Sequence, residues 1–161
     1  MKKILLTVLL LLITVNVFAI QEKIITLNTN VETMNVYFNE VGSLVFYGPV
    51  HSMVVDETTI PNFRAVLDKF IEWDEIASKN SVSDMNKSID FVYHEFFLSF
   101  TYIRISNKAH LKILIRQWND FYNITLDSYE VKRLRDAISE ESLETYKEKI
   151  QIRKKQTELF N

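Results

Sequence analysis

The spacing of hydrophobic residues changes along this chain, and these changes restrict the fold more than any other feature. Across residues 24–56, Met34, Val36 and Phe38 alternate with polar or aromatic neighbours. A period of two is typical of a half-buried strand. The segment 39–42 predicts a turn, because Gly42 can adopt the positive φ that other residues avoid. We expect three or four antiparallel strands in this region.

The segment 59–79 predicts a helix. Thr59 can cap its first turn, and Pro61 lies where a missing N–H has no cost. Residues at three- and four-residue steps then form one apolar face: Phe63, Val66, Leu67, Phe70, Trp73 and Ala77. The polar segment 80–87 predicts a loop, which divides the chain into two possible halves.

The segment 89–118 returns to strand patterning, and we expect a hairpin with its turn at Asn107-Lys108. With Ser106 opposite Ala109, one face carries Leu98, Phe100, Tyr102, Leu111, Ile113 and Ile115. The other face mixes polar and apolar residues: Ser99, Thr101, Ile103, Ile105, His110, Lys112, Leu114 and Arg116. A slip of one residue would destroy this sorting, so the pattern favours one choice of faces.

A second helix is predicted after the short segment 124–126, with Asp127 and Glu130 at the spacing of a capping box. Its buried stripe is Val131, Leu134 and Ile138, and a thinner stripe continues through Leu143, Tyr146 and Ile150. The order is therefore strands, helix, strands, helix. We expect an α+β fold, with one or more antiparallel sheets, helices packed on one face and a charged C-terminal helix.

The amino-terminal segment 1–19 reads as a secretory signal peptide. Lys2 and Lys3 precede the apolar run 4–18, and the segment 17–19 resembles a cleavage site. An uncleaved membrane anchor is the competing interpretation, but the run is shorter than the roughly 20 residues that span a bilayer. We therefore expect a periplasmic or secreted protein with a single domain at 20–139, a charged tail at 140–161 and no stable membrane anchor after cleavage.

Composition excludes several classes of protein. The chain has no cysteine, so packing alone must stabilise the 142 residues left after cleavage. Loss of Lys2 and Lys3 leaves 17 basic and 21 acidic side chains, a net charge of −4. We expect no nucleic-acid partner, because binding to phosphates needs positive charge. Two glycines in the whole chain cannot build a phosphate-binding loop.

No catalytic or metal-binding motif is present. The three histidines are not at zinc-ligand spacing, and we expect no metal and no cofactor. We expect His51 and His110 at the surface. Asp90, His94 and Glu95 could serve a hydrolase, but alternating polar residues of a strand explain them more simply.

Aromatic residues crowd into the segment 91–122. Aromatics are common in sheet cores, yet they can also stack on sugars or other ligands. The candidate ligand-binding residues are Tyr93, Tyr102, Arg104, His110, Lys112, Arg116 and Trp118. We favour an exported, non-enzymatic protein that binds a protein partner or forms a homo-oligomer, because the hairpin carries apolar residues on both faces. A binder of small ligands or glycans is the alternative.

Overall fold

Two four-stranded antiparallel sheets and three helices form the part of the chain that this computed structural model describes, residues 20–89, 97–117 and 120–159. Sheet A contains β1 (Gln21–Asn28), β2 (Thr33–Asn39), β3 (Leu44–Tyr47) and β4 (Ser52–Val55). Sheet B contains β5 (Met85–Ile89), β6 (Phe97–Ile105), β7 (Lys108–Gln117) and β8 (Asp120–Asp127). The helices are α2 (Ile60–Lys79), α3 (Ser128–Ala137) and α4 (Glu140–Glu158). The α+β class and the order strands, helix, strands, helix are confirmed.

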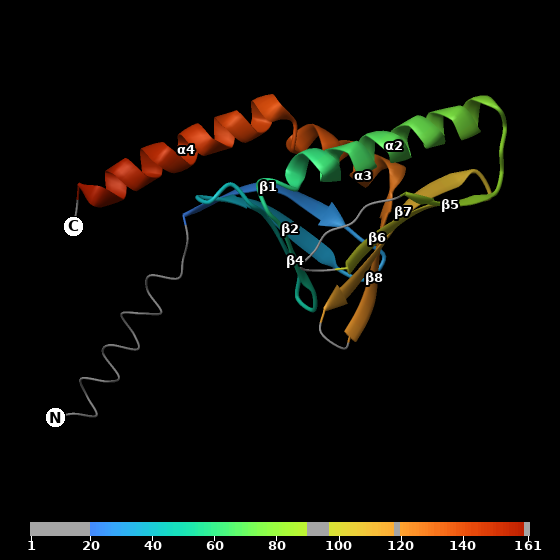
Figure 1. Cartoon of the computed structure of the whole chain (residues 1–161), viewed down its shortest axis with the longest axis horizontal. Coiled ribbons are helices and arrows are strands. Elements are labelled where there is room, and N and C mark those ends of the chain that lie inside the picture. Colours follow the sequence, from blue (N-terminus) through green and yellow to red (C-terminus); the bar gives the residue numbers. More distant parts are fainter. Residues whose placement is uncertain (1–19, 90–96, 118–119, 160–161) are drawn as a thin grey trace.

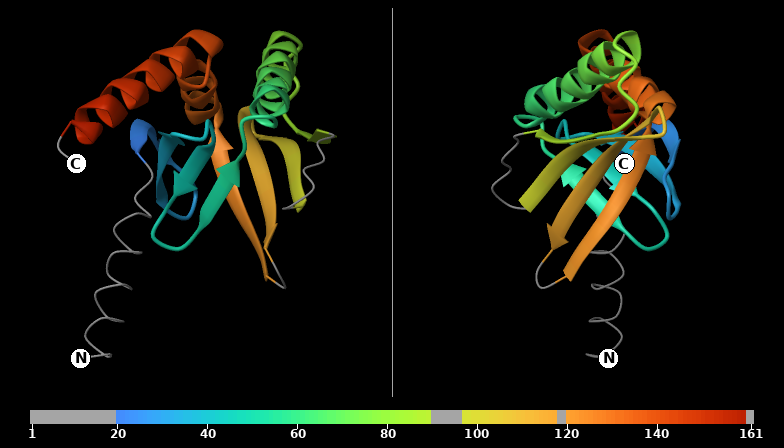
Figure 2. Two further views of the ribbon diagram at one scale, coloured as in Figure 1. Left: turned by 60° about the vertical axis from the view of Figure 1, so that its left-hand side comes forward. Right: turned by 90° about the vertical axis from the view of Figure 1, so that its right-hand side faces the viewer.

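Each sheet is a simple meander in which every strand pairs with the next along the chain. The three helices lie together on one side of the two sheets, and the turn between β3 and β4 points away from them (Figure 1). The two further views show the same arrangement (Figure 2). The helices cover the apolar faces of both sheets, because each sheet presents its alternating hydrophobic residues toward them.

The two halves share one hydrophobic core. The Phe63 ring of α2 lies 5.8 Å from Phe46 of sheet A and 5.8 Å from Phe100 of sheet B. Helix α2 follows sheet A in the sequence but packs on β5 and β6 of sheet B, while α3 packs on β1 as well as on β7 and β8. Each half therefore completes the core of the other, and neither buries its apolar face alone.

The hairpin of β6 and β7 has the predicted faces but a different turn. Ser106 and Asn107 occupy the two turn positions with φ values of 50° and 67°, and Ile105 pairs with Lys108. We expected the turn one residue later. Two-residue hairpin turns require positive φ at both central positions, which Asn adopts more easily than Lys. Every cross-strand partner moves by two residues, so each side chain keeps its face.

Three further boundaries differ from the sequence prediction. The Thr59 side chain makes no capping hydrogen bond; instead Asp56 Oδ1 accepts from the Thr59 N–H. The expected loop at 80–87 ends early, because β5 begins at Met85 and pairs with β6. The segment 124–126 belongs to β8, a full strand beside β7. The last two corrections come from long-range strand pairing that local patterns do not encode, whereas the first is a local change of capping residue.

The C-terminal region forms two helices, with the expected cap at Asp127 and a second cap at Ser139 that was not predicted from the sequence. Asp127 Oδ1 accepts from the Glu130 N–H, and Ser139 Oγ accepts from the Ser142 N–H. Helix α4 buries only Leu143 and Ile150, which is the thin stripe predicted from the sequence. Among the described residues, no helix is both long and apolar enough to cross a membrane.

Candidate functional site

The structure divides the predicted ligand-binding residues between the two faces of sheet B. Tyr102 and Arg104 lie on the buried face, with almost no exposed surface. His110 and Lys112 lie on the opposite, partly exposed face. The backbone of Arg116 pairs in β7, and Tyr93 and Trp118 lie outside the described residues. The described members therefore do not form one binding surface.

Arg104 has a structural role that its polarity did not reveal. Its guanidinium forms an ion pair with Asp74 of α2, and its Nε donates to the Val82 carbonyl oxygen at 2.7 Å. The Ser128 hydroxyl of α3 donates to the other Asp74 oxygen at 2.8 Å. A buried charge is stable only when paired and hydrogen-bonded. This cluster joins α2, α3 and sheet B at one end of the core.

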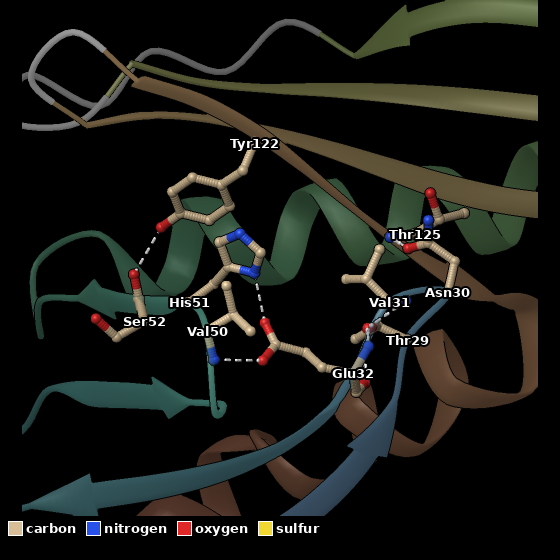
Figure 3. A network of polar contacts seen from close by, with 9 residues as sticks. All are labelled: Thr29, Asn30, Val31, Glu32, Val50, His51, Ser52, Tyr122 and Thr125. Atoms are coloured by element: carbon tan, nitrogen blue, oxygen red, sulfur yellow. Dashed lines mark hydrogen bonds and ion pairs between the residues drawn. The ribbon is translucent and has the colours of Figure 1, made fainter.

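A second polar cluster lies where sheet A meets sheet B (Figure 3). Glu32, in the turn between β1 and β2, has a side chain that is only 4% exposed. Its Oε2 accepts from the Val50 N–H at 2.9 Å, and its Oε1 lies 2.6 Å from His51 Nδ1. Both partners belong to the turn between β3 and β4. One buried carboxylate therefore holds two turns of sheet A together.

Gly48 makes room for this carboxylate. A Cβ atom at position 48 would lie 2.4 Å from Glu32 Oε2, far inside van der Waals contact. One of the two glycines of the chain is therefore explained by close approach rather than by backbone conformation. The Gly48 N–H also donates to the His51 carbonyl oxygen at 2.9 Å, which closes the turn.

The His51 ring is packed rather than free, contrary to the expectation from the sequence. It stacks on Tyr122 of β8, with 4.2 Å between ring centroids and 22° between ring planes. The Tyr122 hydroxyl donates to the Ser52 carbonyl oxygen at 2.7 Å. Burial, and then the negative charge of Glu32, raise the pKa of Tyr122. The phenol therefore stays protonated and keeps donating at neutral pH.

Backbone contacts continue the seam between the sheets. The Thr125 N–H of β8 donates to Asn30 Oδ1 at 2.7 Å, and the Asn30 N–H donates to the Thr125 carbonyl oxygen at 3.2 Å. The turn between β1 and β2 thus satisfies an edge position of β8 that no strand pairs with. We call the group Glu32, Gly48, His51 and Tyr122 the seam cluster.

The seam cluster resembles half of an acid–base site. A carboxylate bonded to His Nδ1 orients the ring and leaves Nε2 for proton transfer. Such a dyad needs a nucleophile or a substrate-binding group at Nε2 to act in catalysis. Among the described residues, the His51 ring hydrogen-bonds only to Glu32, and no group of three His, Cys, Asp or Glu side chains could hold a metal ion. Asp90, His94 and Glu95, considered above for a hydrolase, lie outside the described residues.

Two exposed apolar side chains lie beside the seam cluster. Val31 is 55% exposed and Val50 is 76% exposed. Val31 and Val50 lie on either side of the Glu32 side chain (Figure 3). We call Val31 and Val50 the turn surface. Sequence patterns could not reveal it, because its parts come from two turns whose proximity depends on the fold of sheet A.

Comparisons with known proteins place the chain in no family. No protein-family model matches it, and no curated protein is similar enough to be a relative. Among solved structures, a protein of unknown function from the DUF155 family of Prochlorococcus sp. NATL2A aligns with 65% of this chain and 88% of its own length. The two are 7% identical, with a TM-score of 0.46, and this distant likeness says nothing about function.

Proposed function

We propose that this chain is an exported, non-enzymatic protein that binds another protein through the turn surface. The supporting observation is that the exposed side chains of Val31 and Val50 lie on either side of the buried Glu32 side chain. Single exposed apolar residues are ordinary, but neighbouring ones at the end of a sheet are typical of interaction sites.

The seam cluster gives this surface a defined shape before binding. Both turns are held by Glu32, and the His51 ring is fixed against Tyr122. A loop that is already ordered loses less conformational entropy when a partner binds. Because the buried Glu32 carboxylate fixes both turns before a partner arrives, the exposed apolar side chains of these turns can bind with a smaller loss of entropy.

The export part of the proposal rests on the leader at 1–19. Its positive start, apolar run and cleavage-like end are typical of a signal peptide. A chain without cysteine folds in an oxidising compartment without disulfide rearrangement. The partner is then a protein of the periplasm or of the cell exterior.

The alternative of a small-ligand or glycan binder has less support. Stacking on a ligand needs exposed rings, and Tyr102 and Phe100 lie in the core. His110 and Lys112 remain partly exposed, but no described aromatic ring of the predicted set accompanies them. We therefore keep the protein-binding proposal.

Site-specific photo-crosslinking in cells that export the protein tests the proposal. The chain offers a matched control, because Val41 is also a turn valine and is 68% exposed, but lies in the turn between β2 and β3 at the other end of sheet A. A photoreactive residue at position 50 should give one adduct of defined mass, and the same residue at position 41 should give none.

A second change separates binding from accidental proximity. Val31→Glu places a charge on the turn surface without touching the seam hydrogen bonds, and it should remove the adduct formed from position 50. Equal adducts from positions 41 and 50, or an adduct that survives Val31→Glu, would refute the turn surface as the binding site.

A further inference from the structure

Helix α4 is attached to the body by few apolar contacts. Leu143 and Ile150 are its only buried residues, and Tyr146 is half-buried against the core. Beside this stripe, a pocket of about 200 Å³ that is open to solvent lies between α4, Phe38 and the start of α2. The apolar contact between α4 and the body is therefore interrupted at this point.

Ion pairs supply further contacts along the rest of α4. Arg153 and Lys149 pair with Glu22 of β1. Lys154 pairs with Glu40, and Lys147 pairs with Glu57. In these four pairs the helix is basic and the body is acidic, whereas at the first turn of α4 the polarity is reversed and Glu140 pairs with Arg64 of α2. Glu22, Glu40 and Glu57 therefore mark a groove that recognises a helix with a basic C-terminal half.

The junction between α3 and α4 is a hinge of two residues. Ser139 has a φ of −60° and a ψ of 157°, so only its ψ departs from helical values. Ile138, with φ −107° and ψ 23°, is also outside the helical region. No glycine or proline occurs in 128–158. Rotation of ψ at Ser139 and of both dihedral angles at Ile138 would join α3 and α4 into one helix.

We propose that α4 is exchanged between two copies of this chain. In the exchanged dimer, α3 and α4 of each copy form one continuous helix, and each α4 occupies the acidic groove of the other copy. Every contact of α4 is then made twice across a two-fold axis, which closes the assembly. The groove selects this occupant because the basic residues of α4 pair with the three glutamates and the apolar stripe of α4 packs on the body.

The exchange costs little in contacts, because the dimer remakes what the monomer loses. The difference lies at the hinge, where the bend at Ser139 is replaced by helix, and in the entropy of association. Concentration therefore decides between the two forms. This inference is independent of the turn surface, which lies away from the helices, and each can fail without the other.

Crosslinking between two chains of different mass tests the exchange. The chain has no cysteine, so an engineered cysteine is unique. One version carries Glu22→Cys, and a longer, tagged version carries Arg153→Cys. After the two are mixed, unfolded and refolded together, a short bismaleimide should join them only if α4 of one chain lies in the groove of the other. A pair with Glu22→Cys and Lys79→Cys, at the far end of α2, is the control.

Two substitutions at the hinge make the test quantitative. Ser139→Ala and Ser139→Gly both remove the hydroxyl that caps α4, but alanine favours the continuous helix and glycine disfavours it. The difference in helix propensity is about 1 kcal/mol, or about fivefold per chain. The association constant of the dimer, measured by light scattering after size exclusion at several protein concentrations, should be at least fivefold higher for Ser139→Ala than for Ser139→Gly.

The crosslinking and light-scattering experiments have three possible outcomes. A crosslink between the two versions, with more dimer for Ser139→Ala, supports the exchange. A strict monomer at high concentration without that crosslink overturns it. A dimer that forms without the crosslink, and equally for both hinge variants, assigns the self-association to another surface and also overturns it.

Discussion

The Nδ1 atom of His51 lies 2.6 Å from Oε1 of Glu32, and this contact joins two turns that are separated by the whole of β2 and β3. Because the Glu32 side chain is almost fully buried, its two carboxylate oxygens rely on this histidine and on the Val50 N–H for polar partners. The stability of the turns should therefore respond to changes at position 32.

Glu32→Gln keeps the shape of the side chain but removes its charge. We expect a loss of about 1–3 kcal/mol in the free energy of unfolding, because partners of a buried group are left poorly satisfied. Glu57→Gln, which alters an exposed pair with Lys147, should cost less than about 1 kcal/mol. Urea denaturation of both variants measures the difference, and equal costs would contradict the assigned role of Glu32.

Gly48→Ala should destabilise the protein through a clash with Glu32. The added Cβ would lie 2.4 Å from Oε2, and overpacking of this kind costs about 1–3 kcal/mol. In a Glu32→Ala background the clash is absent, and the cost of Gly48→Ala should nearly vanish.

Gly42→Ala provides the control for this double-mutant cycle. Gly42 has a φ of +81°, so alanine there costs about 1–2 kcal/mol through backbone strain, and its Cβ would also lie 2.8 Å from Glu57 Cδ. That cost should be the same with or without Glu32. If both glycines respond alike to Glu32→Ala, the space argument for Gly48 is wrong.

Asp74→Ala should be far more damaging than Asp68→Ala, although both residues lie in α2. Asp74 is mostly buried and neutralises the buried Arg104, whereas Asp68 is half exposed and pairs with Arg135 at the surface. Breaking a buried pair costs about 3–5 kcal/mol, and an exposed pair contributes about 0–1 kcal/mol. Thermal or urea unfolding of the two variants checks this, and similar costs would refute the buried-pair argument.

Tyr102→Phe should leave stability unchanged or raise it by up to about 1 kcal/mol at neutral pH. In the described part of the chain, the Tyr102 hydroxyl is buried without a hydrogen bond of good geometry, although Arg104 and Asp74 lie close enough to affect its pKa. Removing an unsatisfied buried group is favourable when the ring still fills its space. A clear loss of stability would show that the hydroxyl has a partner.

Alkaline pH provides a second readout for Tyr102. Burial raises its pKa, and the nearby Arg104 opposes part of that rise. The folded chain therefore holds this proton at a pH where the unfolded chain releases it. The free energy of unfolding should fall as pH rises above about 10, the ordinary tyrosine pKa. The fall should be smaller in Tyr102→Phe, while Tyr122, Tyr146 and Lys147, whose pKa values are also raised, contribute to the remaining slope.

Sequence patterns predicted the elements better than their partners. The alternation of Met34, Val36 and Phe38 and the faces of the β6–β7 hairpin are confirmed, because side-chain direction in a strand follows from local periodicity. The turn of that hairpin was predicted one residue late, since several polar residues there could occupy its positions. Register errors of two residues are invisible to a pattern whose period is two.

The candidate site was beyond such patterns. Glu32 and His51 are 19 positions apart, in separate turns. No sequence pattern near either residue indicates that the two side chains pair. Arg104 was assigned to a binding face because of its charge, and only the placement of Asp74 and Ser128 explains its burial. Long-range pairing of polar groups depends on how the elements are stacked, which composition and spacing do not encode.

Local periodicity and capping residues by themselves determined the class, the order of elements and the apolar faces, because these depend on neighbours within a few residues. Tertiary structure alone decided that α2 covers sheet B, that Tyr102 is buried and that Glu32 meets His51. Each of these depends on which apolar surfaces are buried against one another, and that depends on the packing of the whole core.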